Sequence, residues 1–287
     1  MKFSAALATL LLIACAPAIH ADLPGSDDPY DQFRKLTRDE SIKVLNNFRN
    51  YRAQGDQRLR FVITHKIRNA DEDTHYAGEI CATWTATGMV SRVEIRPDGA
   101  PDSANKSFLI INGTTPAVYE TGPDGKPHRI DADTLKPMLP GLVFTPYDLQ
   151  LPFIHWPEFK YKETERFRTR PTDYFRMTPT AEFKKAHPEI ASVNLGFDRA
   201  YNALMRAETL DADGRALRDL RAESFGKIQG KWIITALSLR DEKTRNADTL
   251  EVISAATGLT LPDSVFSPET LGSPLPVTPE SAFQKAD

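Results

Sequence analysis

The residue types that most often carry out catalysis are scattered along this sequence of 287 residues. Five histidines follow the N-terminal segment, and no two of them have the spacing of a metal-binding pair: His65, His75, His128, His155 and His187. A catalytic zinc needs three protein ligands presented together, and nothing in the sequence groups them. The sequence also lacks a G-x-S-x-G elbow, a P-loop and a dinucleotide-binding fingerprint. We therefore predict no catalytic residue, no metal site and no cofactor.

Two cysteines are the other candidates for chemistry. Cys81 lies in an apolar strand pattern, which favours a buried structural thiol over a nucleophile. Cys15 follows Leu12-Ile13-Ala14, a sequence that resembles a bacterial lipobox, and there this cysteine would be lipidated. If Cys15 is removed or lipidated, no disulfide can form within the chain.

The first 21 residues have the pattern of a secretory signal sequence. The apolar run from Phe3 to Ala14 is too short to span a bilayer. Cleavage after Ile19-His20-Ala21 would give a soluble mature chain, whereas cleavage before Cys15 would give an outer-membrane lipoprotein. We predict export to the periplasm or cell envelope and expect the soluble form.

Composition and charge limit the remaining possibilities. The net charge of −3 and the isoelectric point of about 6.1 argue against nucleic-acid binding, which leaves a basic footprint. Residues 22–36 contain prolines, a glycine and aspartates, and they indicate a leader or linker. No repeat or change of composition divides residues 37–261, which we predict to form one β-rich domain. The proline-rich residues 262–287 are predicted to be a loosely ordered tail.

A helix is predicted at the start of the domain. Thr37-Arg38-Asp39-Glu40 has the spacing of a capping box, in which the first and last side chains satisfy each other's backbone N–H groups. Ile42, Leu45 and Phe48 then fall at helical spacing, so we expect a helix over residues 38–53.

Alternating apolar and polar residues predict a large antiparallel sheet of roughly ten strands with a few helices on one side. Turn sequences such as Pro97-Asp98-Gly99 and Asp213-Gly214 separate successive strands. The expected strands lie at about 59–68, 75–85, 88–96, 107–111, 117–120, 159–169, 172–178, 191–198, 201–210, 215–227, 231–240 and 247–254.

The segment from 132 to 158 is unusual because it combines five prolines with many large apolar side chains. Prolines at this density interrupt strands and long helices, although short helical turns near 134–139 and 146–154 are compatible with them. A segment with this many large apolar side chains must cover either the core of the sheet or a bound apolar ligand. Residues 134–157 and the helix at 38–53 could close a ligand cavity. From patterning alone, a packed core is favoured over a cavity.

Two stretches carry a resemblance to a known family. The first is Thr145-Pro-Tyr-Asp-Leu149, which runs into Phe153-Ile-His-Trp156 and Tyr161. The second comprises Leu210-Asp-Ala-Asp-Gly214, Ser224-Phe-Gly-Lys-Ile228, Gly230-Lys-Trp-Ile233, Asp241 with Thr244, and Asp248-Thr-Leu-Glu-Val252. Together with the order of signal sequence, helix, hairpins and apolar cover, they resemble the outer-membrane lipoprotein-sorting proteins of the LolA/LolB superfamily.

The resemblance implies an α+β, mostly antiparallel fold: a strongly curved sheet or incomplete β-barrel with helices covering one face. It also implies a non-enzymatic protein that holds lipid or lipoprotein acyl chains between membranes, where each exposed CH₂ would cost about 0.8 kcal/mol. We expect a monomer, with other envelope proteins as possible partners. The candidate cavity residues are Phe61, Ile63, Trp84, Ile111, Leu149, Phe153, Trp156, Trp232 and Ile234.

Two alternatives remain open at this point. The first is an envelope scaffold or protein-interaction module whose core is filled by its own side chains. The second is an envelope hydrolase, which would need a cleft where a histidine meets a carboxylate or Cys81.

Overall fold

The computed structural model describes residues 31–113, 115–131 and 134–285. The predicted signal sequence, both cleavage sites and Cys15 lie outside these residues. Among the described residues, no helix has the length and apolar character needed to cross a bilayer.

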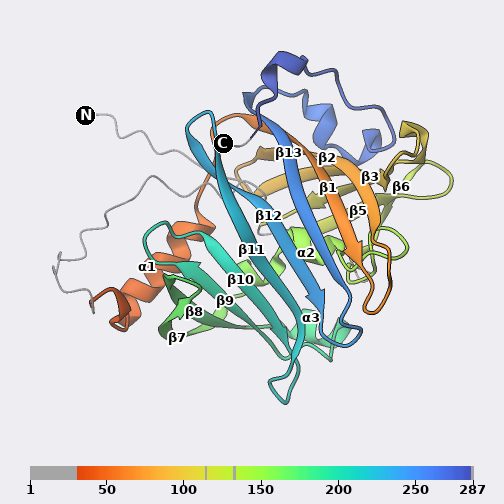
Figure 1. The fold of residues 1–287 in the computed structure, drawn as a ribbon. Helices are drawn as coiled ribbons and strands as arrows, with labels where there is room; N and C mark the ends of the chain where they lie inside the picture. The colour runs from red at the N-terminus through yellow and green to blue at the C-terminus, as the bar shows by residue number, and fades with distance from the viewer. Residues whose placement is uncertain (1–30, 114, 132–133, 286–287) are drawn as a thin grey trace, which may run out of the picture.

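One antiparallel sheet of 13 strands builds the molecule (Figure 1). The strands are β1 (Asp56–Lys66), β2 (Thr74–Trp84), β3 (Met89–Pro97), β4 (Lys106–Ile111), β5 (Ala117–Thr121), β6 (Pro127–Arg129), β7 (Glu158–Phe167), β8 (Arg170–Thr178), β9 (Ser192–Asp198), β10 (Leu204–Leu210), β11 (Ala216–Ile228), β12 (Lys231–Asp241) and β13 (Ala247–Leu259). Their order is β6-β5-β4-β3-β2-β1-β13-β12-β11-β10-β9-β8-β7, so the sheet is open between its edges β6 and β7. The predicted incomplete, mostly antiparallel fold is confirmed, with 13 strands rather than roughly ten.

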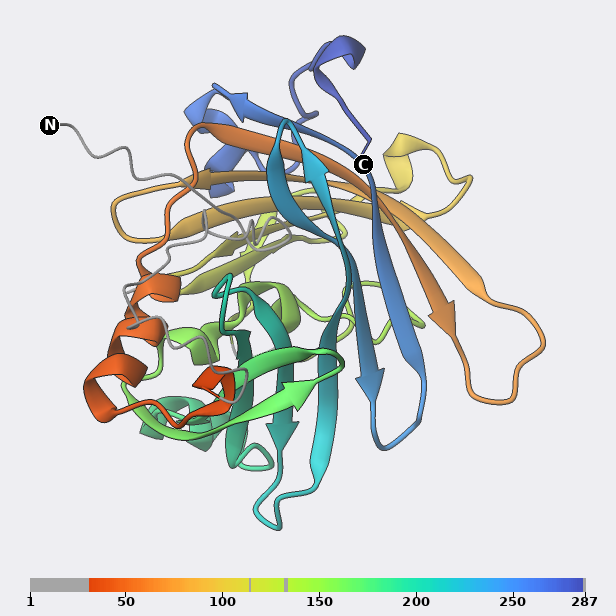
Figure 2. The same cartoon turned by 60° about the vertical axis from the view of Figure 1, so that its left-hand side comes forward.

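The pairing of β1 with β13 joins the two halves of the sheet. Elsewhere in the sheet, neighbours in space are also neighbours along the chain. The sheet curves strongly, and its concave side faces α1 and the segment between β6 and β7 (Figure 2). The unpredicted β6 is only three residues long, too short to show a period of two.

Within the described residues, three α-helices accompany the sheet: α1 (Arg38–Arg49), α2 (Pro146–Gln150) and α3 (Ala181–Ala186). The capping box of α1 is present, because Thr37 Oγ1 accepts from Glu40 N at 3.3 Å and the Glu40 carboxylate accepts from Thr37 N at 2.7 Å. The helix ends four residues earlier than predicted. Short 3₁₀ helices are η1 (Asp31–Phe33), η2 (Asp102–Ala104), η4 (Pro152–His155), η5 (Asp263–Phe266), η6 (Pro268–Thr270) and η7 (Glu280–Ala282).

The C-terminal segment, residues 262–285, is ordered against the convex side of the sheet, contrary to the predicted loose tail (Figure 1). Leu271 is fully buried against Val90 and Leu109 on the outer face of β3 and β4. Arg92 donates to the carbonyls of Thr270 and Ser273. The segment packs here because the outer face of β3 and β4 also carries apolar and charged side chains, which it covers. The alternation of residues along these strands did not predict this packing.

Candidate functional site

The concave side of the sheet is covered by residues 134–157, here called the lid segment. Its apolar side chains join those of the sheet in one cluster, and each is less than a tenth exposed: Met138, Leu139, Leu142, Val143, Phe144, Tyr147, Leu149, Leu151, Phe153, Ile154 and Trp156. Tyr147 of α2 stacks on Phe183 of α3, with ring centroids 5.6 Å apart. In this conformation, the chain's own side chains pack the space between the lid segment and the sheet.

Six predicted cavity residues lie together in this cluster: Phe61, Ile63 and Ile234 from the sheet, and Leu149, Phe153 and Trp156 from the lid segment. Trp84 lies at the end of β2 and is half-buried, with the Arg52 guanidinium 4.8 Å above its ring. Its indole Nε1 is buried and has no acceptor among the described residues.

The predicted inward direction is wrong for Ile111 and Trp232. Ile111 packs on the outer face with Leu271 of the C-terminal segment. Its strand is apolar on both sides, so alternation could not assign its direction. Trp232 is 38% exposed, and Lys227 Nζ lies 4.8 Å from its ring. The consecutive Ile233 and Ile234 are both buried in the core cluster, so strict alternation does not hold in this part of β12.

A buried carboxylate of β13 fastens the lid segment to the sheet. Asp248 is fully buried and accepts hydrogen bonds from the backbone N–H groups of Val143 and Phe144, each at 2.7 Å. His65 Nδ1 of β1 lies 2.6 Å from its other oxygen. Burial raises the pKa of Asp248, while hydrogen bonds from Phe144 and His65 oppose that rise. We call Asp248 and His65 the latch.

A second fastening comes from β11. The Arg218 guanidinium donates to Asp148 at 2.5 Å and to the Val143 carbonyl at 2.7 Å. Asp148 also accepts from the Thr145 N–H at 2.9 Å, which caps α2. One arginine of the sheet therefore holds both the loop before α2 and the helix itself.

Helix α1 is tied to the other end of the lid segment. Arg49 in its last turn donates to the carbonyls of Ile154 and Trp156, each at 2.6 Å. One turn earlier on the same face of α1, Leu45 is fully buried in the core cluster. Displacing α1 therefore disturbs the lid segment, and the converse also holds.

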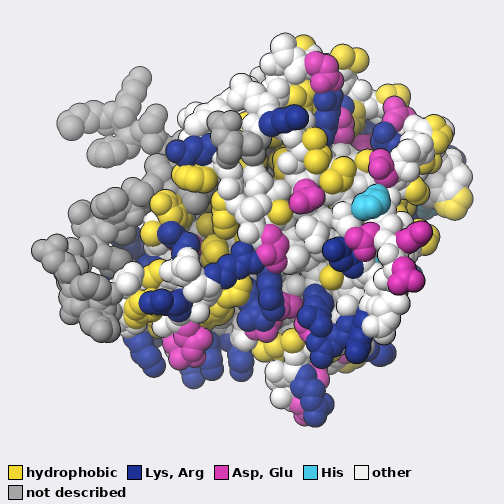
Figure 3. Space-filling model, in the orientation of Figure 1, with side chains coloured by type: hydrophobic (Ala, Val, Ile, Leu, Met, Phe, Trp, Pro, Cys, Tyr) yellow, Lys and Arg dark blue, Asp and Glu magenta, His cyan; other side chains and the backbone are white. Residues whose placement is uncertain are grey.

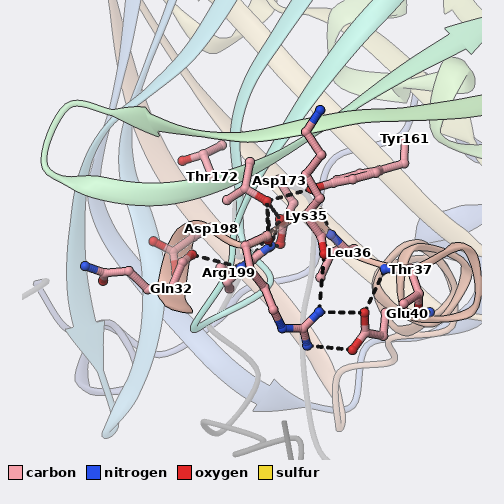
Figure 4. Close-up of polar contacts among 12 residues, drawn as sticks. Gln32, Lys35, Leu36, Thr37, Glu40, Tyr161, Thr172, Asp173, Asp198 and Arg199 are labelled. Carbon is pink, nitrogen blue, oxygen red and sulfur yellow. Dashed lines mark hydrogen bonds and ion pairs between the residues drawn. The ribbon is translucent and has the colours of Figure 1, made fainter. Parts of the chain in front are cut away.

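The chain before α1 is held by a buried ion pair (Figure 4). Arg199, in the turn after β9, lies 2.6 Å from Asp173 of β8, whose side chain is only 1% exposed. The same guanidinium donates to the carbonyls of Gln32 at 2.8 Å and Arg34 at 2.9 Å. The start of α1 is thus fixed while its other end contacts the lid segment.

A hollow of about 690 Å³ lies between α1 and β7, at one open edge of the sheet. We call it the α1–β7 groove. Its apolar lining includes Ile42, Pro157, Phe159 and Tyr161, and polar groups such as Arg38 and Lys160 complete it. Phe159 and Tyr161 also contact the fully buried ring of Phe175, so the groove borders the core.

The buried histidine–carboxylate pair and the thiol, two groups that a hydrolase could use, are shielded from solvent, whereas the His128–Asp124 pair is exposed at the surface. The latch histidine and aspartate are 2% and 0% exposed, and the aspartate already accepts two backbone N–H groups. Cys81 is fully buried on the outer face, where burial raises its pKa to about 12. In the described part of the chain, no three His, Cys, Asp or Glu side chains group as metal ligands.

The fastening residues were not predicted, although the sequence contains a signal for two of them. His65 and Asp248 occupy the inward phase of alternating strands, in line with Phe61 and Ile63 and with Leu250. A titratable group in an apolar phase must find a buried partner. Nothing local marks Arg49, Arg218 or Arg199, whose partners are at least 26 residues away in the sequence.

Comparison with solved structures shows the same fold in three proteins of low sequence identity. A domain described as an outer membrane lipoprotein-sorting protein from Vibrio parahaemolyticus has a TM-score of 0.68 and 16% identity, covering 82% of this chain and 100% of its own. A DUF1329 family protein from Desulfovibrio piger has a TM-score of 0.66 and 14% identity, covering 81% and 98%. A LolA superfamily protein from Nitrosomonas europaea has a TM-score of 0.58 and 17% identity, covering 81% and 98%.

The sequence comparisons are sparser. No curated protein matches the chain. The sequence model of one family, described as "Uncharacterized protein", matches residues 104–273, which is more than half of the chain. The matched region runs from the last residue of η2, just before β4, through the lid segment to three residues beyond η6. The protein therefore belongs to this family, and its structure has the LolA-superfamily fold.

Proposed function

We propose that this protein is a non-enzymatic carrier of the cell envelope that shields the acyl chains of lipids or lipoproteins beneath its lid segment. The observation that carries the proposal is an apolar lid over an apolar concave sheet, fastened by a few polar contacts. Acyl chains would replace the lid side chains against Phe61 and Ile234. Shielding is worth about 0.8 kcal/mol for each CH₂ kept from water.

The fastenings support an opening that does not require unfolding. Each of these hydrogen bonds has a charged partner, Asp248, Arg218 or Arg49, and contributes about 1.5–3 kcal/mol. Opening would break these contacts and leave the pairing of the strands intact. The described fold relative from Vibrio parahaemolyticus is named for lipoprotein sorting, which agrees with the proposal. The α1–β7 groove offers an access route, because its apolar side chains reach from the surface to the core.

Lipid extraction provides the first test. Protein purified from cells would be extracted and analysed by mass spectrometry, and the emptied protein would be titrated with a fluorescent fatty acid. We expect bound lipid in the first measurement and saturable uptake, competed by unlabelled fatty acid, in the second. Empty protein together with no uptake would contradict the proposal.

A matched pair of variants locates the access route. Ile42→Glu places a carboxylate in the groove, whereas Asn47→Glu places the same charge on the exposed face of the same helix. We expect Ile42→Glu to weaken probe binding about tenfold or more, since an apolar chain would meet a charge that must stay hydrated. Asn47→Glu should bind as the wild type does.

The filled interior gives specific support to a second candidate, an envelope scaffold with external protein partners. The same titration separates the two, because a scaffold keeps its core closed and takes up no probe. The site of action depends on the N-terminus. A soluble chain cleaved after Ala21 could cross the periplasm, whereas one lipidated at Cys15 could only hold cargo at a membrane. Metabolic labelling with a fatty acid, repeated on Cys15→Ala, decides between these forms.

A further inference from the structure

Two hairpin turns lie side by side at one end of the sheet, because β1 pairs with β13 as far as Lys66 and Ala247. The Arg68 N–H of the β1–β2 turn donates to the Asn246 side chain of the β12–β13 turn at 3.1 Å. Within the second turn, Asp241 accepts from the Thr244 N–H at 2.6 Å. The two turns are therefore fixed in shape and joined to each other.

A hollow of about 420 Å³ lies between these turns, and we call it the cationic hollow. Its lining consists of Lys66, Ile67, Arg68, Arg240 and Arg245, with no carboxylate among these five. Figure 3 shows Lys and Arg side chains gathered on this face near the ends of β12 and β13. The hollow is open to solvent, and Ile67 within it is 48% exposed.

The positive charge of the hollow is only partly balanced. Glu242 is shared between two arginines, at 3.1 Å from Arg245 and 3.6 Å from Arg240. Asp73 lies 3.6 Å from Lys66. These contacts are loose compared with other arginine pairs of the chain, such as Arg34–Glu40 at 2.6 Å and Arg206–Asp219 at 2.8 Å.

The Arg68 side chain has no acidic partner among the described residues. The contact of Arg68 with the other turn comes from its backbone N–H, which donates to Asn246. Two further acidic residues of the same loop, Asp71 and Glu72, do not line the hollow. Three guanidinium groups and one ammonium thus surround a small concave space, and the two carboxylates paired with them balance only part of their charge. Guanidinium forks match the geometry of phosphate oxygens.

We propose that the cationic hollow binds a phosphate ester, supplied by the headgroup of a lipid whose acyl chains lie under the lid segment. The inference rests on the proposed carrier function and narrows its cargo to a phosphate-bearing lipid. Position supports this choice over a free phosphate ester. Ala247 lies between Lys66 and Arg240, and the next residue, Asp248, holds Val143 and Phe144 of the lid on the inner side.

Adjacent strand residues point to opposite faces, so the hollow lies on the outer face and the lid on the inner face, and the two are neighbours at the end of the sheet where the β1–β2 and β12–β13 turns close. An amphiphile could keep its anionic head in the hollow and its chains below the lid. Exposed Ile67 would contact the glycerol carbons between them. An acylated cysteine has no such charge at its head, so this site would distinguish a phospholipid from a lipoprotein.

Short-chain lipids test the proposal in solution. The purified protein would be titrated calorimetrically with dihexanoyl-phosphatidylglycerol below its micelle concentration, with glycerol 3-phosphate, and with uncharged dihexanoylglycerol. The test variant is Arg68→Gln with Arg245→Gln. The matched control is Arg215→Gln, an exposed arginine paired with Asp213 at another hairpin.

We expect phosphatidylglycerol to bind most tightly, with an affinity that falls as salt is added. The affinity for phosphatidylglycerol should fall about tenfold or more in the double variant and less than twofold in the control. Glycerol 3-phosphate binding as tightly as the lipid would overturn the headgroup assignment and leave a site for a free phosphate ester. Equal affinities in wild type and double variant, or no binding of either anion, would overturn the site itself.

The fatty-acid titration shows whether the cationic hollow or the carrier proposal has failed. If the double variant takes up the fatty-acid probe as the wild type does and lacks headgroup binding, both proposals stand. If it binds phosphatidylglycerol unchanged while still taking up the probe, only the cationic hollow is refuted. If the wild type takes up no probe, the carrier proposal fails on its own measurement.

Discussion

Removing the latch carboxylate should release the lid segment while leaving the sheet in place. In Asp248→Ala, the backbone N–H groups of Val143 and Phe144 lose their acceptor in a fully buried site. Each unpaired group costs about 1–3 kcal/mol, so the closed lid should weaken by at least about 2 kcal/mol. A loss of that size raises the open population about 30-fold.

Amide hydrogen exchange measures this opening. The informative amides are those of the lid segment whose acceptors do not involve Asp248, such as Leu151, which donates to the Tyr147 carbonyl at 3.0 Å. Their protection should fall about 30-fold, together with faster uptake of the fluorescent fatty acid. Asp248→Asn should have a smaller effect, because its amide oxygen can still accept from both lid N–H groups.

Asp198→Ala is the matched control. Asp198 is also buried and accepts two backbone N–H groups, those of Ala200 and Tyr201 at 2.9 Å, together with an arginine. It lies at the β9–β10 turn and touches no part of the lid segment in the described structure. Equal loss of lid protection in both variants, or less than a threefold change at Leu151 in Asp248→Ala, would refute the latch.

Three further outcomes are expected. Arg49→Gln, which loses two hydrogen bonds to lid carbonyls, should reduce the protection of the amides at 154–156 by about tenfold. Unchanged exchange there would show that α1 does not stabilise the lid segment. Leu45→Ala empties a fully buried site on α1 and should lower the free energy of unfolding by about 2–5 kcal/mol in urea titration. The hydrogen bond from Arg34 lowers the pKa of Glu40 from 4.5 to about 2. The ionised carboxylate therefore adds to the free energy of unfolding above pH 4.5, and this contribution is lost as the pH falls toward 2. The stability difference between wild type and Glu40→Gln, under about 1 kcal/mol at neutral pH, should therefore shrink over that range, and a difference that grew would reverse the assigned sign.

The periodic parts of the fold could be predicted from the sequence. The capping box at Thr37 and Glu40 places α1, and the alternation around Phe61 and Ile63 gives both a strand and its buried face. The family resemblance gave the open, curved sheet. The short helix α3 was missed, because six residues between two prolines carry too little periodicity.

Long-range features were harder to predict. The C-terminal segment looked like a tail because its prolines exclude regular structure, yet prolines do not prevent packing of a side chain such as Leu271. Trp232 lies two residues from the β11–β12 turn and is partly exposed, which depends on where the strand pair ends rather than on composition. Six of the nine candidate cavity residues lie in the core cluster, whereas the polar groups that fasten the lid lie far apart in sequence.

The C-terminal segment also has a consequence for redox chemistry. Cys81 lies between Arg58 and Arg92 on the outer face, and both arginines donate to carbonyls of that segment. A thiol oxidises through its thiolate, which burial suppresses here, so the protein could pass through an oxidising compartment without a cysteine partner. Glu79 and Glu94 offset the effect of the two arginines on the pKa of Cys81, so burial controls its reactivity. Proteolytic trimming beyond Leu261 would remove part of the cover on this face, and the trimmed protein would become prone to form disulfide-linked dimers.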